Sequence, residues 1–558
     1  MRRMYPAICA AVLASASFAC APGEPGSGAA AGSLDLLIVD ARIVDGGGNP
    51  WYRADVGVRD DRIVAVGELS GREAMRTIDA EDRVLAPGFI DMMGQSTLVL
   101  ITDPPSAESK LRQGITTYLS GEGGSPAPRR EEWEGIVVGD ETHDWTSYAE
   151  YFEVLEGHGI PLNVVHDVGL TQVRRVVLGE NDVAPTPEQL DEMKALVRQA
   201  MEDGAVGTST SLIYPPAIYA DTEELVALTR VAAEYGGVYF THMRNESHAV
   251  LEAIREALEV GAGAGVPVHI YHLKAAGQEN WPLMAQALAL IDLARSARMD
   301  VTADIYPYIR NGIGLGSFVH PRHYARGRDA FLETLSDPAV RAELRNEIET
   351  TGDWENWYRH VGMDWAEVLI VSAPDDVDPG VVNRSIAEAA EVLGTDPWNA
   401  FFDLVQAGGV SVNPRSMNEE QKRQALRAPF VMIDTDASPV NPETTDSSHP
   451  RAFGAFPRVI ATYVREDSVL SLEDAVRRMT SMAAHRLGLH DRGYVAPGMA
   501  ADLVIFDPET IRDVADFGAD AMRYAEGVDY LVVNGRLVID GGELVPITPG
   551  RVLRRRGS

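Results

Sequence analysis

"GVYFTHM" (237–243) and "VPVHIYHL" (266–273) are two short apolar segments with the length and composition of buried β-strands. Similar segments occur at 162–169 and 299–308. Stretches with the apolar spacing of helices separate them; one, 186–204, begins at a threonine suited to an N-cap and ends at a glycine. Strands that alternate with helices predict a parallel sheet. Because the alternation repeats many times, we predict an α/β fold of the (β/α)8 TIM barrel type.

The two ends of the chain show a different pattern. Residues 34–86 alternate apolar and polar side chains in short runs that Gly, Asn and Asp interrupt, which is typical of antiparallel strands. Residues 486–548 repeat this pattern, and Asn534-Gly535 has the sequence of a tight hairpin turn. We therefore predict that the two segments join into one small β-sandwich domain.

The predicted barrel domain occupies the chain between these segments, from residue 87 to residue 485. The regular alternation is lost at about 310–425, so we predict an insertion in that range. Residues 549–558 form a short basic tail, which we expect to be a disordered end.

Length and charge limit the possible functions. A chain of 558 residues with 45% hydrophobic and 24% charged residues has an ordinary globular composition and is long enough for a large core. Its formal net charge is −34. A nucleic-acid partner is therefore not expected, because a binder needs basic surface to neutralise phosphates.

The first twenty residues differ from the rest of the chain. Arginines at positions 2 and 3 precede an apolar, alanine-rich stretch that ends at Cys20, which predicts a secretory signal peptide over 1–20. The stretch resembles a bacterial lipoprotein signal, and residues 21–33 read as a flexible tether. We expect an exported protein, either periplasmic or anchored to the membrane through a lipidated Cys20; simple cleavage is the alternative. Both cysteines lie in the signal segment, so we expect no disulfide in the folded part.

Several of the predicted strands end on residues that can bind a metal ion or move a proton. In a barrel of this kind, the carboxyl ends of the strands converge on one site. Histidines together with carboxylates form a set of ligands that suits Zn²⁺. The residues at these ends are Glu122, His242, His272, Asp434 and Asp436, with Lys274 two positions after the second histidine.

Longer motifs carry a resemblance to a known family. The β-rich ends, "APGFID" (86–91) and "GMAADLVIFDP" (498–508) resemble the amidohydrolase superfamily. Within it, the chain resembles the N-acyl-D-amino-acid deacylases, or D-aminoacylases, from residue 34 to about residue 548. The motifs that carry this closer resemblance are "GTSTSLIYPPAIYADTEEL" (207–225), "THMRNE" (241–246), "HLKAAG" (272–277), "ADIYPY" (303–308) and "HPRAFGAFPRV" (449–459).

The resemblance implies roles for individual residues. It implies that His242 and His272 hold a zinc ion and that Asp436 is the base that takes a proton from the attacking water. Arginine and lysine side chains suit a substrate carboxylate, and a guanidinium can bind one through two parallel hydrogen bonds. The positions that match substrate contacts in the family are Tyr214, Lys274, Tyr306 and Arg451.

The chain departs from the family pattern at two places. Where the family carries a His-x-His step, this chain has Met93 and Gln95. The family's metal-binding cysteine falls opposite Gly123, one residue after Glu122. We therefore predict Glu122 as the third metal ligand; the alternative is that Glu122 hydrogen-bonds a loop and Asp436 supplies the third bond. The resemblance implies that the lost histidines belong to the weaker metal site, so we expect one Zn²⁺ per chain.

The function that follows is hydrolysis of the amide bond of a small molecule, an N-acyl-D-amino acid, to a carboxylate and a free D-amino acid. One alternative is hydrolysis of another C–N bond, in a D-peptide or a cyclic amide, at the same site. A second alternative is an exported binding protein without catalysis. The sequence carries no indication of an oligomeric state.

The export signal generates the first prediction. The mature chain is expected to begin at or near Cys20, which mass spectrometry of the protein from its native host would establish. Replacing Cys20→Ser separates the two forms of export, because only a lipid-anchored protein moves from the membrane to the soluble fraction. Intact Met1 on protein from the cytoplasm would contradict the prediction.

Overall fold

The computed structural model describes residues 33–352 and 354–555. The predicted signal segment and all of the predicted tether except Ser33 lie outside the described residues. Among the helices of the described chain, none combines the length and the apolar character needed to cross a membrane.

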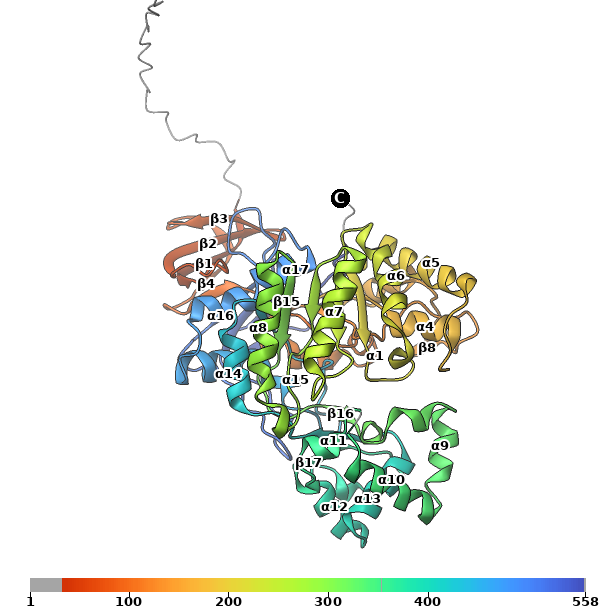
Figure 1. Cartoon of the computed structure of the whole chain (residues 1–558). Helices are drawn as coiled ribbons and strands as arrows, with labels where there is room; N and C mark the ends of the chain where they lie inside the picture. Colours follow the sequence, from red (N-terminus) through yellow and green to blue (C-terminus); the bar gives the residue numbers. More distant parts are fainter. Residues whose placement is uncertain (1–32, 353, 556–558) are drawn as a thin grey trace, which may run out of the picture. The chain divides into compact units, whose positions relative to one another are not determined.

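Within the described residues, eight parallel strands form a barrel, which confirms the predicted α/β (β/α)8 fold (Figure 1). They pair in sequence order, and the N–H of Met92 donates to the C=O of Ile433 at 3.4 Å where the last strand meets the first. Between the third and fourth strands, the N–H of Val206 donates to the C=O of His166 at 2.8 Å. The strands are β6 (Phe89–Asp91), β7 (Ile115–Ser120), β10 (Asn163–His166) continued by β11 (Val168–Gly169), β12 (Gly207–Ser211), β13 (Val238–His242), β14 (Val268–Ile270), β15 (Val301–Ile305) and β19 (Val431–Ile433).

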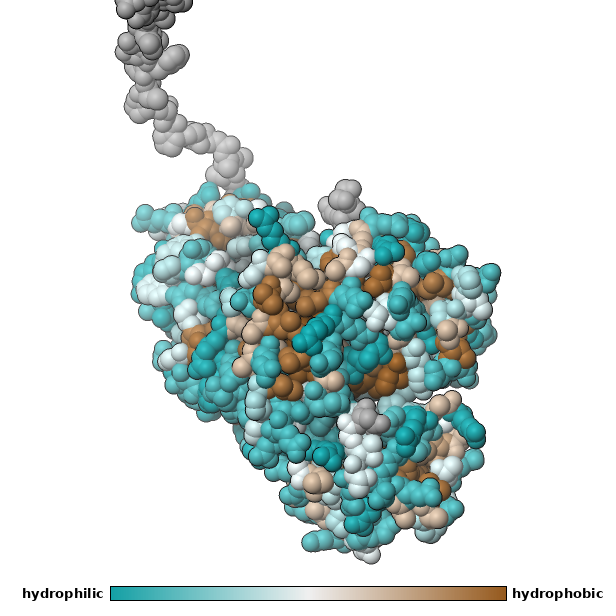
Figure 2. Space-filling model, viewed as in Figure 1, coloured by the Kyte–Doolittle hydropathy of each residue, from teal (hydrophilic) through white to brown (hydrophobic). Residues whose placement is uncertain are grey.

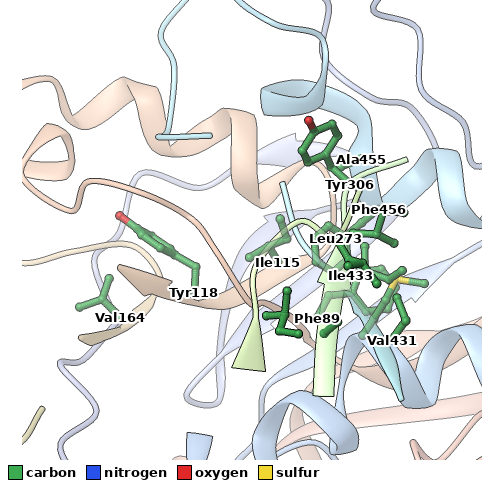
Figure 3. Close-up of a cluster of buried hydrophobic side chains, with 14 of the residues drawn as sticks. Phe89, Ile115, Tyr118, Val164, Leu273, Tyr306, Val431, Ile433, Ala455 and Phe456 are labelled. Atoms are coloured by element: carbon green, nitrogen blue, oxygen red, sulfur yellow. The ribbon is translucent and has the colours of Figure 1, made fainter. Parts of the chain in front are cut away.

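Apolar side chains from distant parts of the sequence pack together beside these strands (Figure 3). Phe89, Ile115 and Ile433 come from the barrel strands and are fully buried. The ring of Phe89 stacks on Phe456, with ring centroids 5.7 Å apart. Burial of one such side chain stabilises the fold by about 1.5–3 kcal/mol. This packing anchors the barrel strands, whose carboxyl ends carry the candidate site.

Helices follow the strands and cover the outside of the barrel (Figure 1). The stretch predicted as helical forms α5, with Thr186 as a hydrogen-bonded N-cap and Gly204 as a left-handed C-cap. Figure 2 shows hydrophobic residues gathered over α7 and α8, where Leu293 is 67% exposed. The helices are α1 (Val99–Thr102), α2 (Glu108–Leu111), α3 (Tyr148–His158), α4 (Leu170–Leu178), α5 (Pro187–Asp203), α6 (Thr222–Ala233), α7 (Val250–Ala264), α8 (Leu283–Ser296), α14 (Glu419–Arg427), α15 (Arg451–Arg458), α16 (Leu472–Met479) and α17 (Ser481–Leu487).

Strands from both ends of the chain share one sheet, nine-stranded in the described residues. β5 of the N-terminal segment pairs with β20 of the C-terminal segment, antiparallel. Asn534 and Gly535, both with positive φ, form the two-residue turn between β21 and β22. The strands are β1 (Leu34–Ile43), β2 (Tyr52–Arg59), β3 (Arg62–Gly67), β4 (Ala74–Asp79), β5 (Val84–Pro87), β20 (Leu503–Phe506), β21 (Val528–Val533), β22 (Arg536–Asp540) and β23 (Glu543–Leu544).

An insertion with its own core separates β15 from α14 (Figure 1). Its aromatic residues pack closely; the ring centroids of Trp365 and Phe401 are 4.8 Å apart. The insertion is shorter than the predicted range of 310–425, because α14 contacts β15 and β19 and so belongs to the barrel. Its elements are β16 (Ile313–Gly314), α9 (Arg328–Thr334), α10 (Pro338–Thr350), α11 (Trp357–His360), β17 (Val368–Ser372), α12 (Ile386–Leu393), α13 (Pro397–Ala407) and β18 (Ser411–Pro414). A separate hairpin, β8 (Ile136–Val138) with β9 (Glu141–His143), follows β7.

The basic tail corrects one expectation from the sequence. Its described part, up to residue 555, is not a loose end: Val552 forms a parallel bridge with Val164 of β10. The N–H of Leu553 donates to the C=O of Val164 at 2.8 Å. Arg554 forms an ion pair with Glu156 of α3, with N–O distances of 2.9 and 3.0 Å. Charge alone misled the prediction, because apolar Val552 and Leu553 lie between the arginines.

Candidate functional site

Most of the residues predicted from the sequence as functional line one small cavity of about 70 Å³. Asp434, also at the end of β19, does not line it. Gln95 and Glu246 are among the further residues that line the same space. The predicted residues that line the cavity are Glu122, Tyr214, His242, His272, Lys274, Tyr306, Asp436 and Arg451.

The turn after β7 explains why Glu122 takes the position next to the histidines. A Cβ at Gly121 would lie 2.1 Å from a carboxylate oxygen of Asp167. A Cβ at Gly123 would lie 2.5 Å from the backbone nitrogen of Ser211, and φ there is +73°. The position that aligns with the family's cysteine therefore has no room for a side chain. Glu122 is the residue of this turn that reaches the cavity.

The carboxylate of Glu122 lies between two imidazole rings. Its Oε1 is 2.7 Å from Nδ1 of His242 and 3.1 Å from Nε2 of His272. These three ligand atoms lie within 4.8 Å of one another, as the ligands of one metal ion would. Burial raises the pKa of Glu122, but the two histidines lower it by more through their hydrogen bonds and charge. The pKa of Glu122 therefore lies well below its usual range. Glu122 is therefore an anion although its side chain is only 16% exposed.

Glu246 orients both rings and was not predicted from the sequence. Its Oε1 lies 2.9 Å from Nδ1 of His272, and its Oε2 lies 3.5 Å from Nε2 of His242. Glu246 thus faces the ring nitrogens on the opposite side from Glu122, where the ligand histidines of metal sites usually have a carboxylate neighbour. Lys274 holds Glu246 in turn, with Nζ 2.7 Å from Oε2 and 2.6 Å from Nδ1 of His272. The sequence did contain a signal for Glu246, because this residue ends the "THMRNE" motif that carries the family resemblance.

The electrostatics of the cavity favour positive charge. Burial and Lys274 lower the pKa of His272, but the carboxylates of Glu246, Asp436 and Glu122 outweigh them and raise it to about 10. The carboxylates around His272 therefore favour positive charge in this part of the cavity, as a metal cation would also supply.

A second group of possible ligands lies on the other side of His242. Nε2 of His242 and the carboxylates of Glu246 and Glu355 also lie within 4.8 Å of one another. The backbone N–H of Glu246 donates to Glu355, which comes from the insertion. Burial and the neighbouring Glu246 raise the pKa of Glu355 to about 8, so this carboxyl is neutral at pH 7. Because Lys274 already pairs with Glu246, this group is less suited to a metal ion than the one at Glu122.

Asp436 is held from two sides. Its Oδ2 lies 2.5 Å from Nη1 of Arg451, and its Oδ1 accepts a hydrogen bond from Nε2 of Gln95 at 2.9 Å. Arg451 lies over the ring of Tyr306, 4.6 Å from its centroid. The hydroxyl of Tyr306 is buried and has no hydrogen-bond partner among the described residues. Arg451 is thus paired with the predicted base and also faces the cavity.

Three residues of the site have a left-handed backbone. Gln95 has φ of +59°, His272 of +36° and Asp436 of +44°. Residues other than glycine seldom adopt this conformation, and where they do the surrounding structure holds them there, often at functional sites. The chain bends sharply at each of these strand ends.

A buried ion pair holds the bend at Asp436. Lys110 and Asp91 are both 0% exposed, with Nζ 2.7 Å from Oδ2. Lys110 also donates to the C=O of Ala437 at 2.7 Å, and Asp91 accepts from the N–H of Thr435 at 2.9 Å. Removal of one partner of such a pair costs about 3–5 kcal/mol. The pair therefore joins the end of β6 to the segment after β19 that carries Asp436.

Comparison with known proteins identifies the family. A family model described as the amidohydrolase family matches residues 76–539.

The chain belongs to the amidohydrolase family.

This amidohydrolase is 34% identical to the N-acyl-D-glutamate deacylase of Alcaligenes xylosoxydans xylosoxydans, over 94% of this chain and 97% of that protein. Its fold matches the N-acyl-D-glutamate deacylase of Bordetella bronchiseptica, solved with zinc and a phosphonate inhibitor, with a TM-score of 0.78 and 30% identity over 94% of this chain and 100% of that chain. A D-aminoacylase described as having a binuclear metal centre, with one-metal activation and second-metal attenuation, matches with a TM-score of 0.77 and 30% identity over 93% of this chain and 100% of that chain. The resemblance seen in the sequence motifs is confirmed.

A larger cavity, of about 920 Å³, adjoins the site of this amidohydrolase. Tyr214 and Trp357 line both cavities, so the larger one begins where the smaller one ends. Its walls come from the loop after β12, which carries Ile213, and from the insertion, which supplies Leu315 and Trp354. It offers an apolar space next to the candidate site.

Proposed function

We propose that this protein hydrolyses the amide bond of N-acyl-D-amino acids with one zinc ion per chain. The observation that carries the proposal is the set formed by Glu122, His242 and His272, placed beside Asp436 in a cavity at the carboxyl ends of the barrel strands. The related deacylases and the zinc in the Bordetella bronchiseptica structure support it.

The donor set fits zinc. Two imidazole nitrogens and one carboxylate oxygen are the usual protein ligands of a catalytic zinc site, which keeps one further position open. Glu246 faces the opposite ring nitrogens, Nε2 of His242 and Nδ1 of His272. When bound, zinc polarises the amide C=O and lowers the pKa of water towards neutrality.

Asp436 is the proposed general base. Its hydrogen bond from Gln95 and its ion pair with Arg451 hold the carboxylate in one orientation, and each oxygen keeps a further lone pair. It accepts a proton from the attacking water and donates a proton to the leaving nitrogen. The product amine then leaves as a free amino group.

Arg451 and Tyr306 are the proposed binding groups for the α-carboxylate. The guanidinium has five N–H donors, of which the ion pair with Asp436 uses only part. The unpartnered hydroxyl of Tyr306 adds a further donor. Lys274 is engaged with Glu246, so we assign it to the orientation of His272 as well as to the cavity wall. Such binding groups favour an open carboxylate over a cyclic amide.

We also propose that the cavity of about 920 Å³ receives the apolar part of the substrate. Its volume favours a bulky acyl group or side chain over an acetyl group, and a short D-peptide would also fit by size. Export to the periplasm or the outer face of a membrane remains our proposal for where the enzyme acts.

Amine release from paired N-acyl-D- and N-acyl-L-amino acids, with zinc supplied, tests the proposed function. We expect hydrolysis of the D-forms and faster turnover when the acyl group is long and apolar. Equal rates of hydrolysis for the D- and L-enantiomers, or hydrolysis of cyclic amides alone, would reject N-acyl-D-amino acids as the substrate class. Absence of turnover together with absence of bound zinc would favour the binding-protein alternative.

Substitution of the proposed base generates a further prediction. Asp436→Asn keeps the size of the side chain but cannot take a proton at the same oxygen. We expect turnover to fall by about 10²–10⁴-fold, the usual contribution of general acid–base catalysis. Zinc content, measured by elemental analysis, is expected to stay unchanged. Near-normal turnover of this variant would rule out the mechanism.

The role of Glu122 is tested by Glu122→Gln. Loss of the negative charge between His242 and His272 is expected to weaken zinc binding and activity together. The measurement is zinc retained after mild chelation, with Glu188→Gln of α5, an exposed residue that lines neither cavity, as a matched control. Full retention by the Glu122→Gln protein would remove Glu122 from the set of ligands.

A further inference from the structure

We propose that the side-chain amide of Gln95 occupies the place of a second metal ion, so that this amidohydrolase binds one metal ion only. The inference rests on the proposed function and extends it to the metal content of the site. Gln95 stands at one of the two positions where the family carries a histidine.

The contacts of Gln95 are those of a clamp between two carboxylates. One atom, Nε2, donates to Oε2 of Glu122 at 2.8 Å and to Oδ1 of Asp436 at 2.9 Å. A primary amide has two N–H groups, so each carboxylate receives one. Carboxylates only accept hydrogen bonds when ionised, and therefore the nitrogen and not the oxygen of the amide faces them.

The backbone directs this side chain into the site. Gln95 has φ of +59°, in the left-handed region, and its side chain lines the cavity. Met93, at the other position of the lost His-x-His step, is 0% exposed and packs with Ile90 and Phe240 in an apolar cluster instead. Of the two substituted positions, one has thus become core and the other has gained new partners in the site.

A divalent cation that bridged Glu122 and Asp436 would need the same two oxygens that Gln95 now binds. The amide supplies two donors but no charge, so it keeps the two acidic groups together without a metal. The related D-aminoacylase has a binuclear centre in which the second metal attenuates activity. In this chain the Gln95 amide excludes a second ion from the space between these two carboxylates, while Oε1 of Glu122 stays free to face His242 and His272.

The decisive experiment counts metal ions without measuring activity. Metal-free wild-type protein, Gln95→Glu and Met93→Leu are equilibrated with excess zinc, freed of unbound metal by gel filtration, and analysed for zinc per chain. We expect one zinc in the wild type and in Met93→Leu, which conserves the apolar packing. Gln95→Glu has the same length but places a third carboxylate beside Glu122 and Asp436, so we expect two.

The outcomes separate the inference from the proposed function. Two zinc ions in the wild type, or one in Gln95→Glu, would overturn the role of Gln95 and leave the hydrolase assignment standing. No zinc in the wild type would overturn both. One in the wild type and two in Gln95→Glu would support both.

A kinetic readout tests the positioning of Asp436 by the same amide. Gln95→Leu keeps the bulk but loses both hydrogen bonds, so kcat is expected to fall by about 10–100-fold with little change in KM, since a misplaced base slows chemistry rather than binding. Excess zinc is expected to leave wild-type activity unchanged and to attenuate Gln95→Glu. Unchanged kcat in Gln95→Leu, or attenuation of the wild type by zinc, would contradict the proposal.

Discussion

A buried carboxylate that must stay charged organises this site. Glu122 is partly shielded from water, and an isolated charge in such a place costs several kcal/mol, of the order that unfolds a protein. Two imidazoles and one amide compensate it, at distances of 2.7–3.1 Å. The same compensation is what a metal ion would supply, so the arrangement that stabilises the charge also prepares a cation site.

The supports of Glu122 reach through the fold. Its turn depends on two glycines whose neighbours leave no space for a Cβ. The rings that face it are oriented by Glu246, which Lys274 holds in place. The amide that faces it follows β6, whose end the pair of Lys110 and Asp91 joins to the segment after β19. These supports follow the strands β6, β7, β13 and β14, so the site is complete only when these strand ends lie together in the barrel.

The sequence alone predicted the barrel and most of the residues that line the cavity. Strand periodicity predicted the barrel, and the strand ends and family motifs pointed to the residues that line the cavity. Glu246 was missed because it lies four residues beyond a strand end, and its meaning depends on the ring nitrogens that it faces. Gln95 was interpreted only as a lost ligand. Its partners Glu122 and Asp436 lie 27 and 341 positions away in the sequence, and only the tertiary structure brings them together. The tail after residue 549 was misjudged because its charge concealed two apolar residues that pair with β10.

A crystal structure of the zinc-loaded protein, with anomalous scattering recorded at the zinc edge, tests the central claim most directly. The account predicts one zinc peak per chain, bonded to Glu122, His242 and His272, with the amide of Gln95 between Glu122 and Asp436. A second peak between those two carboxylates, or a single peak among His242, Glu246 and Glu355, would contradict it.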